Sequence, residues 1–405
     1  MMVKKYNLIN NLLGLIVCIC ACAVYLLTVE PTVSFWDCGE YLATAYKLQV
    51  GHPPGAPTFQ LLGRIFSMLA GDDVTKVAFY INSMSALCSG FTILFLFWAL
   101  TMLGRKLALA KGGELTNGKV LAIFGSALVG AFAYTFSDTF WFSAVEGEVY
   151  AMSSFCTALV FWAILKWDAV ADTNYSNRWI IFIAFVIGLS IGVHLLNLLT
   201  VPAMGLIIYF RKFKPSTKGT IKALIISFLT IAVILWGIVP YIVKCSGWFE
   251  RLFTNSFGTG FYVGTIIYFA IIVALLICGI VYSERKQKRI FNLAMLSLTF
   301  MLIGYSTFFI LTIRSNANTP IDENNPEDAV SLLDYLNRYQ YGSNPLVYGQ
   351  YYNSRVKENK DGDPVYVKNY IINNSYGEVT RFYSEKDAKD FVAKNTDKYG
   401  AMTIK

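Results

Sequence analysis

The residues best suited to chemistry follow the first long apolar stretch of the chain. Asp37 and Glu40 lie three residues apart within residues 34–41, and His52 begins a rigid His-Pro-Pro-Gly run shortly afterwards. A carboxylate that removes the proton from an acceptor hydroxyl accelerates nucleophilic attack by about 10²–10⁴-fold. Ionisable groups at the border of a membrane usually mark a site or a pathway. These residues therefore favour group transfer at a membrane surface.

The rest of the sequence indicates a membrane protein that must position this loop. Of the 405 residues, 55% are hydrophobic and only 15% are charged, whereas a soluble domain carries about 25% charged residues. The apolar blocks are roughly 20 residues long, enough to cross a bilayer core. We predict an all-α polytopic membrane protein with about nine transmembrane helices, over residues 8–28, 76–103, 119–136, 148–166, 178–193, 194–210, 221–243, 261–283 and 291–313.

The charges in the loops set the orientation of these helices. Lysine and arginine gather in alternate loops, and the N-terminus carries Lys4 and Lys5. Because loops rich in these residues stay in the cytoplasm, we expect a cytoplasmic N-terminus and an outward-facing first loop. Residues 178–210 must then form two short or re-entrant helices, because a single span would place the basic loop after Phe210 outside. The net charge of +8 reflects this topology, and no nucleic-acid partner is expected.

This topology brings one set of polar residues to the outer membrane surface. Besides Asp37, Glu40 and His52, the set consists of Asp138, Glu146, Glu148, His194, Arg251 and Arg314. A leaving phosphate needs positive charge. Arg314 lies at the outer end of the last helix and is expected to supply it, with Arg64 and Arg251 as alternatives. Trp36 is expected to be an interfacial anchor whose ring can also stack on a sugar.

Several of these residues also have a purely structural interpretation. Asp37 and Glu40 can be the N-cap and first-turn acid of a helix over residues 40–50. His52 can be a turn residue, and His194 can form a hydrogen bond between helices. The arginines can be interfacial anchors that extend toward water.

Glu146 and Glu148 lie two residues apart and cannot share one helical face, so at most one of them is expected to point inward. Asp37 together with one of these glutamates could hold a divalent cation, but oxygen ligands alone fix neither its presence nor its identity. No Cys/His spacing indicates a zinc site. No cofactor is required by the sequence.

The composition changes after Arg314. Residues 315–405 are polar, and we predict a small α+β segment on the outer side, following a membrane domain over residues 1–314. Residues 326–336 read as a capped amphipathic helix. The chain ends at Lys405 without a recognisable terminal motif, which suggests truncation.

Four blocks of the sequence resemble glycosyltransferase family 117. They are residues 32–41 with 51–55, residues 144–150, residues 188–194, and residues 318–328, the last of which resembles the Bacteroidota branch of the family. The resemblance extends over most of residues 1–340, and the first block is highly specific.

The resemblance implies a GT-C fold and an inverting glycosyltransferase. Such an enzyme moves a sugar, here mannose or another hexose, from a polyprenyl-phosphate carrier to an acceptor hydroxyl on a protein Ser/Thr or a glycan. It implies a bacterial inner-membrane protein whose active site faces the periplasm. By analogy with GT-C enzymes, Asp37 is the catalytic base, and Glu40 and His52 orient Asp37 or the acceptor.

The remaining residues of the outer set are expected to bind substrate: Trp36, Glu146, Glu148, His194, Arg251 and Arg314. The alternative function is a membrane transporter or lipid-linked sugar flippase without catalysis. Ionisable groups in the middle of helices or an inverted repeat would favour that alternative. The acids here lie in loops beside the membrane, and the first-loop signature is not repeated.

Overall fold

The computed structural model describes residues 2–110, 112–342, 345, 347–355, 364, 366–373, 379–399 and 402–404. Eight helices of these residues are long and apolar enough to cross a membrane. They are α1 (Met2–Leu27), α4 (Val77–Leu109, preceded by a short turn), α5 (Asn117–Thr135), α7 (Val149–Val170), η3 with α9 (Leu195–Lys212), α10 to α11 (Thr217–Phe257), α12 (Val263–Arg285) and α13 to α14 (Arg289–Ser315). The predicted polytopic helical class is confirmed.

The ambiguous region 178–210 forms two short helical segments, as predicted. α8 (Asn177–Ile191) is apolar but shorter than the others, and a turn at residues 192–194 leads into η3 (Leu195–Thr200) and α9 (Val201–Lys212). The two segments run antiparallel, because Asp172 before α8 forms ion pairs with Arg211 and Lys212 at the end of α9. The turn therefore lies at the opposite end of the bundle, beside α3, where Gly192 accepts a hydrogen bond from Thr58.

One boundary differs from the prediction. Residues 244–257, expected as an outer loop, continue the helix: α10 (Thr217–Ala232) passes through a π-helical turn, Val233–Ile238, into α11 (Val239–Phe257). The polar side chains there interrupt the apolar pattern, but Glu250 is accommodated because its carboxylate caps the start of α12. Its oxygens accept the backbone N–H groups of Tyr262 and Thr265 at 2.5 and 2.9 Å.

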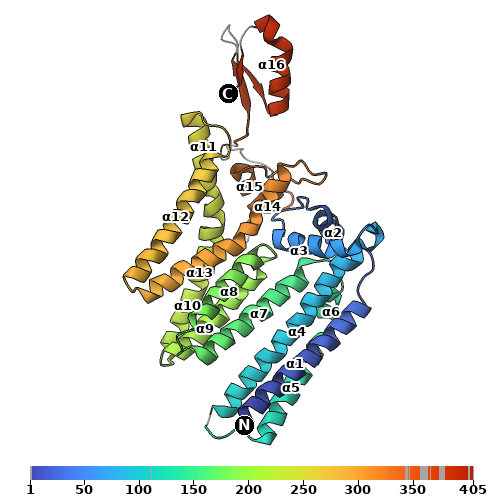
Figure 1. The fold of residues 1–405 in the computed structure, drawn as a ribbon, viewed down its shortest axis with the longest axis vertical. Coiled ribbons are helices and arrows are strands. Elements are labelled where there is room, and N and C mark those ends of the chain that lie inside the picture. The colour runs from blue at the N-terminus through green and yellow to red at the C-terminus, as the bar shows by residue number, and fades with distance from the viewer. Residues whose placement is uncertain are drawn as a thin grey trace.

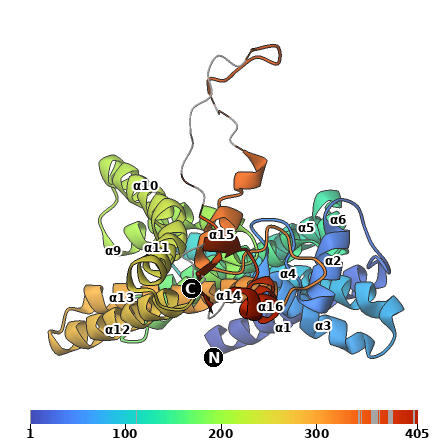
Figure 2. The same cartoon turned by 90° about the horizontal axis from the view of Figure 1, so that it is seen from above.

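The transmembrane helices pack in two groups. α4 contacts α1, α5 and α7, and α8 lies against α7 and α13. Gly188 and Gly304 allow α8 and α13 to approach closely, since a Cβ on Gly188 would lie only 2.1 Å from the carbonyl oxygen of Met301. Small residues at such crossings let membrane helices contact through their backbones. Seen from above, α9 to α13 lie on one side and α1 to α6 on the other, with α14 and α15 between them (Figure 2).

Short helices gather at the end of the bundle opposite the N-terminus (Figure 1). They are α2 (Cys38–Lys47), α3 (Pro57–Ser67) and α6 (Asp138–Ala144), followed in the last part of the chain by α14 (Phe309–Ser315) and α15 (Ala329–Leu336). α15 begins at the predicted cap, where Asp328 accepts the N–H groups of Val330 and Ser331. A three-stranded sheet in the order β2-β1-β3, from β1 (Tyr370–Asn373), β2 (Val379–Phe382) and β3 (Thr403–Ile404), lies beside α16 (Glu385–Tyr399).

Candidate active site

Asp37 occupies the N-cap position of α2, but its carboxylate accepts no capping hydrogen bond. Its side chain is 62% exposed. The preceding Trp36 adopts the left-handed conformation (φ +59°) and is 89% exposed. The loop therefore turns sharply just before α2 and leaves both side chains at the surface. The capping interpretation of Asp37 explains its position in the chain but not the orientation of its side chain.

His52 lies between the two carboxylates of the first loop. Glu40 Oε1 accepts the backbone N–H of His52 at 2.5 Å, and Glu40 Oε2 lies 3.0 Å from His52 Nδ1. The other ring nitrogen, Nε2, is 3.9 Å from Asp37 Oδ2. Gly51 makes the double contact possible, because a Cβ at that position would lie 2.5 Å from Glu40 Oε1. Glu40 thus fixes the ring orientation so that its far edge faces Asp37.

The charges of His52 and Glu40 stabilise each other. The hydrogen bond that His52 makes to the Glu40 carboxylate is the main cause that raises the pKa of His52 above its usual value, against the effect of burial, and Asp37 adds to it. Burial acts to raise the pKa of Glu40, but the hydrogen bonds from His52 outweigh it and the pKa lies below its usual value. Both shifts favour the charged forms, a protonated histidine beside an ionised glutamate.

Glu146 and Glu148 are both buried beneath the first loop. Glu146 Oε2 accepts a hydrogen bond from the hydroxyl of Ser34 at 2.7 Å, and Glu148 Oε1 accepts the N–H of Val149 at 3.0 Å. The prediction that at most one of them points inward is wrong. It assumed a helix, whereas the two glutamates lie in a tight turn, with a hydrogen bond from Glu148 N to Glu146 O, just before α7 begins.

Glu148 is the most perturbed carboxyl of this group. Burial raises its pKa to about 7, and the nearby charges of Asp37 and Glu146 contribute to the shift. The same glutamates, after burial itself, help raise the pKa of the Cys38 thiol to about 12. Asp37, Glu40, His52, Glu146 and Glu148 therefore form one electrostatically coupled cluster, which we call the carboxylate cluster.

His194 lies at the same end of the bundle but has a structural role. It is the N-cap of η3, where its Nδ1 accepts the N–H of Leu196 at 3.2 Å, and its ring lies 5.5 Å from that of Tyr150. Burial lowers its pKa. Asp138 is the first residue of α6, whose N-cap is Ser137. No described contact joins either residue to the carboxylate cluster.

Contrary to the prediction, the arginines do not lie beside the carboxylates. Arg314 donates from Nε to Leu48 O at 2.5 Å and from Nη2 to Lys47 O at 3.2 Å, so it caps the end of α2 remote from Asp37. Arg64 caps the same end through Tyr46 O at 2.7 Å. A helix C-terminus exposes unpaired carbonyls and attracts cations, which explains both positions.

Arg251 lies in α11, away from the carboxylate cluster, because the residues predicted as a loop continue that helix. Its guanidinium stacks 3.9 Å from the centre of the Tyr366 ring. Both residues line a groove of about 690 Å³ with Trp248 and Asp334. Among the described residues, no contact links Arg251 to the carboxylate cluster.

A later part of the chain closes over the first loop, which sequence reasoning missed. Val50 donates its N–H to Ile321 O at 3.0 Å and accepts that of Glu323 at 3.0 Å. The buried Tyr335 donates its hydroxyl to Gly51 O at 2.6 Å. The block 318–328 was recognisable as a motif, but one sequence gives no signal that it pairs with residue 50.

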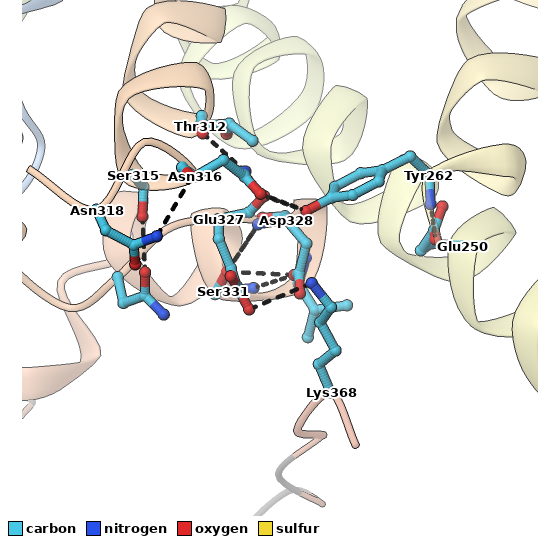
Figure 3. A network of polar contacts seen from close by, with 12 residues as sticks. Glu250, Tyr262, Thr312, Ser315, Asn316, Asn318, Glu327, Asp328, Ser331 and Lys368 are labelled. Carbon is cyan, nitrogen blue, oxygen red and sulfur yellow. Dashed lines mark hydrogen bonds and ion pairs between the residues drawn. The ribbon is translucent and has the colours of Figure 1, made fainter. Parts of the chain in front are cut away.

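An apolar groove of about 420 Å³ lies between α11, α12 and α13. Its lining is almost entirely hydrophobic, and polar residues occur where it meets α14 and α15 (Figure 3). There Tyr262 donates its hydroxyl to Asn316 Oδ1 at 2.6 Å, and Lys368 lies 3.7 Å from Glu327. The groove therefore combines an apolar length within the membrane with a polar end on the side of the carboxylate cluster.

Within the described ranges, no group of three or more His, Cys, Asp or Glu residues is arranged to hold a metal ion. The side chains of the carboxylate cluster can transfer protons and form hydrogen bonds. Its one strongly exposed carboxylate is Asp37, and its most readily protonated carboxyl is Glu148.

Comparison with known proteins finds a similarity that includes this cluster. Residues 37–217, which contain all five residues of the cluster, match the family model "Protein O-mannosyl-transferase TMEM260 N-terminal domain". The chain is 29% identical over 137 residues to the protein O-mannosyl-transferase tmem260 of Dictyostelium discoideum, an alignment that covers 34% of the chain and 15% of the relative.

It is 22% identical over 337 residues to the protein O-mannosyl-transferase TMEM260 of Mus musculus, which covers 74% of the chain and 44% of the relative. The chain thus spans less than half the length of these two curated relatives. No solved structure matches it.

Proposed function

We propose that this chain is a membrane glycosyltransferase that transfers a mannosyl or other hexosyl group from a polyprenyl-phosphate carrier to a Ser/Thr hydroxyl of an acceptor protein. The observation that carries the proposal is an exposed carboxylate, Asp37, oriented by the Glu40–His52 pair. It lies in a segment that matches the N-terminal domain of protein O-mannosyl-transferases.

In the proposed reaction, Asp37 accepts the proton of the acceptor hydroxyl while the hydroxyl oxygen attacks the anomeric carbon. The bond between that carbon and the phosphate oxygen breaks, and the polyprenyl phosphate leaves with the electron pair. One displacement inverts the anomeric configuration. Asp37 suits the role of base because it is exposed to an incoming acceptor and its carboxylate lies 3.9 Å from the ring of His52.

The buried glutamates suit a supporting role. A carboxyl whose pKa is about 7 holds its proton part of the time at neutral pH, so Glu148 can donate a hydrogen bond to a sugar hydroxyl or to a developing negative charge. Glu146, bonded to Ser34, holds the loop that carries Asp37 against the start of α7. We assign neither residue the role of base, because both are buried.

The donor's isoprenoid chain is proposed to lie in the apolar groove between α11, α12 and α13. A largely hydrophobic cavity open along the membrane fits a long hydrocarbon better than a soluble substrate. The basic loops at the N-terminal end of the bundle support a cytoplasmic position for that end. The carboxylate cluster would then face the extracytoplasmic side, which in a bacterium is the periplasm.

Transfer by the Asp37→Asn variant tests this assignment. We expect a loss of about 10²–10⁴-fold in turnover, the contribution of a general base, with thermal stability unchanged because Asp37 makes no capping bond. The matched control is Asp72→Asn, which removes an exposed acid outside the cluster and should retain full turnover. Wild-type turnover in Asp37→Asn would overturn the role of Asp37.

A further inference from the structure

A second polar cavity lies at the other end of the bundle, between α1, α4 and α7. Its volume is about 520 Å³, and its lining includes three asparagines of α1, Arg105 of α4, and Lys166 of α7. None of these residues takes part in the proposed transfer. The lining residues of α1 lie near its start, and the start of α1 is at the end of the bundle opposite α2 (Figure 1), so the cavity and the carboxylate cluster lie at opposite ends.

The asparagines form a polar stripe on a membrane helix. Asn7, Asn10 and Asn11 are spaced i, i+3 and i+4, so they share one face of α1. The neighbouring Leu8 and Leu12 are 60% and 51% exposed and belong to the face that meets lipid. Amide groups at this position are costly unless they find hydrogen-bond partners. Asn10 is half-buried, whereas Asn7 and Asn11 are exposed, so the stripe offers amide groups to a polar group in the cavity.

Several polar atoms in or beside the cavity have no partner in the described chain. They are Tyr6 Oη, Asn10 Oδ1, Trp98 Nε1 and Asp168 Oδ1, all of them buried. Buried polar atoms without partners are rare in native proteins, and each needs an explanation such as a bound group. Two of them, Tyr6 Oη and Trp98 Nε1, are donors that line the cavity, and they support a site completed by a ligand with acceptor oxygens. Asn10 Oδ1 and Asp168 Oδ1 are acceptors and do not bear on an anionic ligand.

Two positive charges in the cavity also lack a counter-ion. Arg105 stacks 5.1 Å from the centre of the Tyr6 ring and Lys166 stacks 5.6 Å from that of Trp162. Neither forms an ion pair with a described carboxylate. By contrast, the adjacent Lys106 pairs with Asp168 at 2.5 Å, and no described acid is left over to neutralise the other two cations.

We propose that this cavity binds the phosphate group of an anionic lipid. Arginine and lysine are the usual phosphate ligands, and asparagine amides can donate to the remaining oxygens. The volume lies in the range of sites for drug-sized ligands and is much larger than a bare phosphate needs. Basic pockets between transmembrane helices on the cytoplasmic side bind lipid head groups. The acyl chains would follow the exposed leucines of α1.

Lipid retention by the full chain tests the proposal without using transferase activity. The chain is purified in detergent with a mixture of phosphatidylglycerol and phosphatidylcholine of equal acyl length, and bound lipid is counted by native mass spectrometry. We expect preferential retention of phosphatidylglycerol, reduced at least tenfold in Arg105→Gln/Lys166→Gln, since each cation near a membrane surface contributes about a fivefold effect. The charge-preserving Arg105→Lys/Lys166→Arg should retain most of it.

The matched control is Arg178→Gln/Lys222→Gln, which removes two cations at the same end of the bundle that do not line the cavity. It should retain phosphatidylglycerol as the wild type does. If the double glutamine variant does not fold, Lys166→Gln alone should lower retention about fivefold.

Equal retention in the cavity and control variants would overturn the proposal. Displacement of phosphatidylglycerol by an equimolar amount of inorganic phosphate would overturn the assignment to a lipid and indicate a free phosphate instead.

Discussion

The two polar ends of this molecule handle charge in opposite ways. In the carboxylate cluster, every ionisable group except Asp37 has a hydrogen-bond partner within the chain: Glu40 has His52, Glu146 has Ser34, and Glu148 has Val149. In the cavity between α1, α4 and α7, two cations stack on aromatic rings but form no ion pair with a described carboxylate, and several buried polar atoms have no described hydrogen-bond partner. A preorganised set of side chains suits proton transfer, whereas an incomplete set suits binding of a group that completes it.

The Glu40→Ala variant should disrupt the preorganised end most strongly. It leaves the backbone N–H and ring nitrogen of His52 without partners, and unpaired polar groups of this kind cost about 2–3 kcal/mol together. We expect thermal unfolding to show that loss and transfer to fall by about tenfold or more, because Asp37 is no longer held. Stability equal to that of the wild type would show that the pair is not formed.

The same variant should change the pH dependence of stability. The pKa of His52 is raised in the folded state, so its stabilising contribution is present below its unfolded pKa of about 6.5 and is lost as the pH rises through the higher folded value. Glu40→Ala should remove this alkaline loss, which urea unfolding at several pH values would detect.

The Glu148→Gln variant should likewise remove a loss of stability at rising pH, but it should stabilise the protein where Glu40→Ala destabilises it. The folded pKa of about 7 lies above the unfolded value of about 4.3, so the folded protein binds more protons between these values. The free energy of unfolding should therefore fall as the pH rises across that window and stay level above it. Glutamine retains an oxygen for Val149 N–H, and the variant should be more stable than the wild type above pH 7 by on the order of 2 kcal/mol. Equal pH profiles would contradict the shift.

The sequence allowed the main features of the carboxylate end to be predicted, whereas the cavity between α1, α4 and α7 was not predicted. The apolar blocks and loop charges predicted the helices, and the first-loop motif grouped Asp37, Glu40 and His52. The burial of both Glu146 and Glu148 depended on a turn just before α7, which helical spacing rules describe wrongly. The roles of Arg314 and Arg251 depended on which partners the fold brought near, such as the carbonyls of α2, and spacing in the chain does not encode such long-range contacts.

The Gly51→Ala variant tests whether the lack of a side chain at residue 51 allows Glu40 and His52 to pair. A Cβ there would lie 2.5 Å from Glu40 Oε1, whereas a Cβ at Gly118 would meet nothing within 4 Å. We expect Gly51→Ala to cost about 1–2 kcal/mol through overpacking and to lower transfer. Gly118→Ala should be neutral or slightly stabilising in a helix. Thermal unfolding of the two variants side by side makes the comparison, and equal melting temperatures would contradict the close packing.

The Tyr335→Phe variant should give the smallest effect. It removes the hydroxyl that donates to Gly51 O at 2.6 Å and keeps the buried ring, so about 1 kcal/mol is expected. Hydrogen exchange at residues 48–52 should increase if α15 holds the first loop in place. Unchanged exchange there would mean that the loop is held by its own contacts alone.

The central claim is that the carboxylate end carries out sugar transfer, and the wild-type chain itself tests it most directly. The purified protein is incubated with a polyprenyl-phosphate-linked mannose and an acceptor protein, and released polyprenyl phosphate is measured together with the anomeric configuration of the product. We predict release of polyprenyl phosphate in equal amount to transferred sugar, with inverted configuration. Movement of the intact lipid-linked sugar across vesicles without release would contradict the account and identify a flippase.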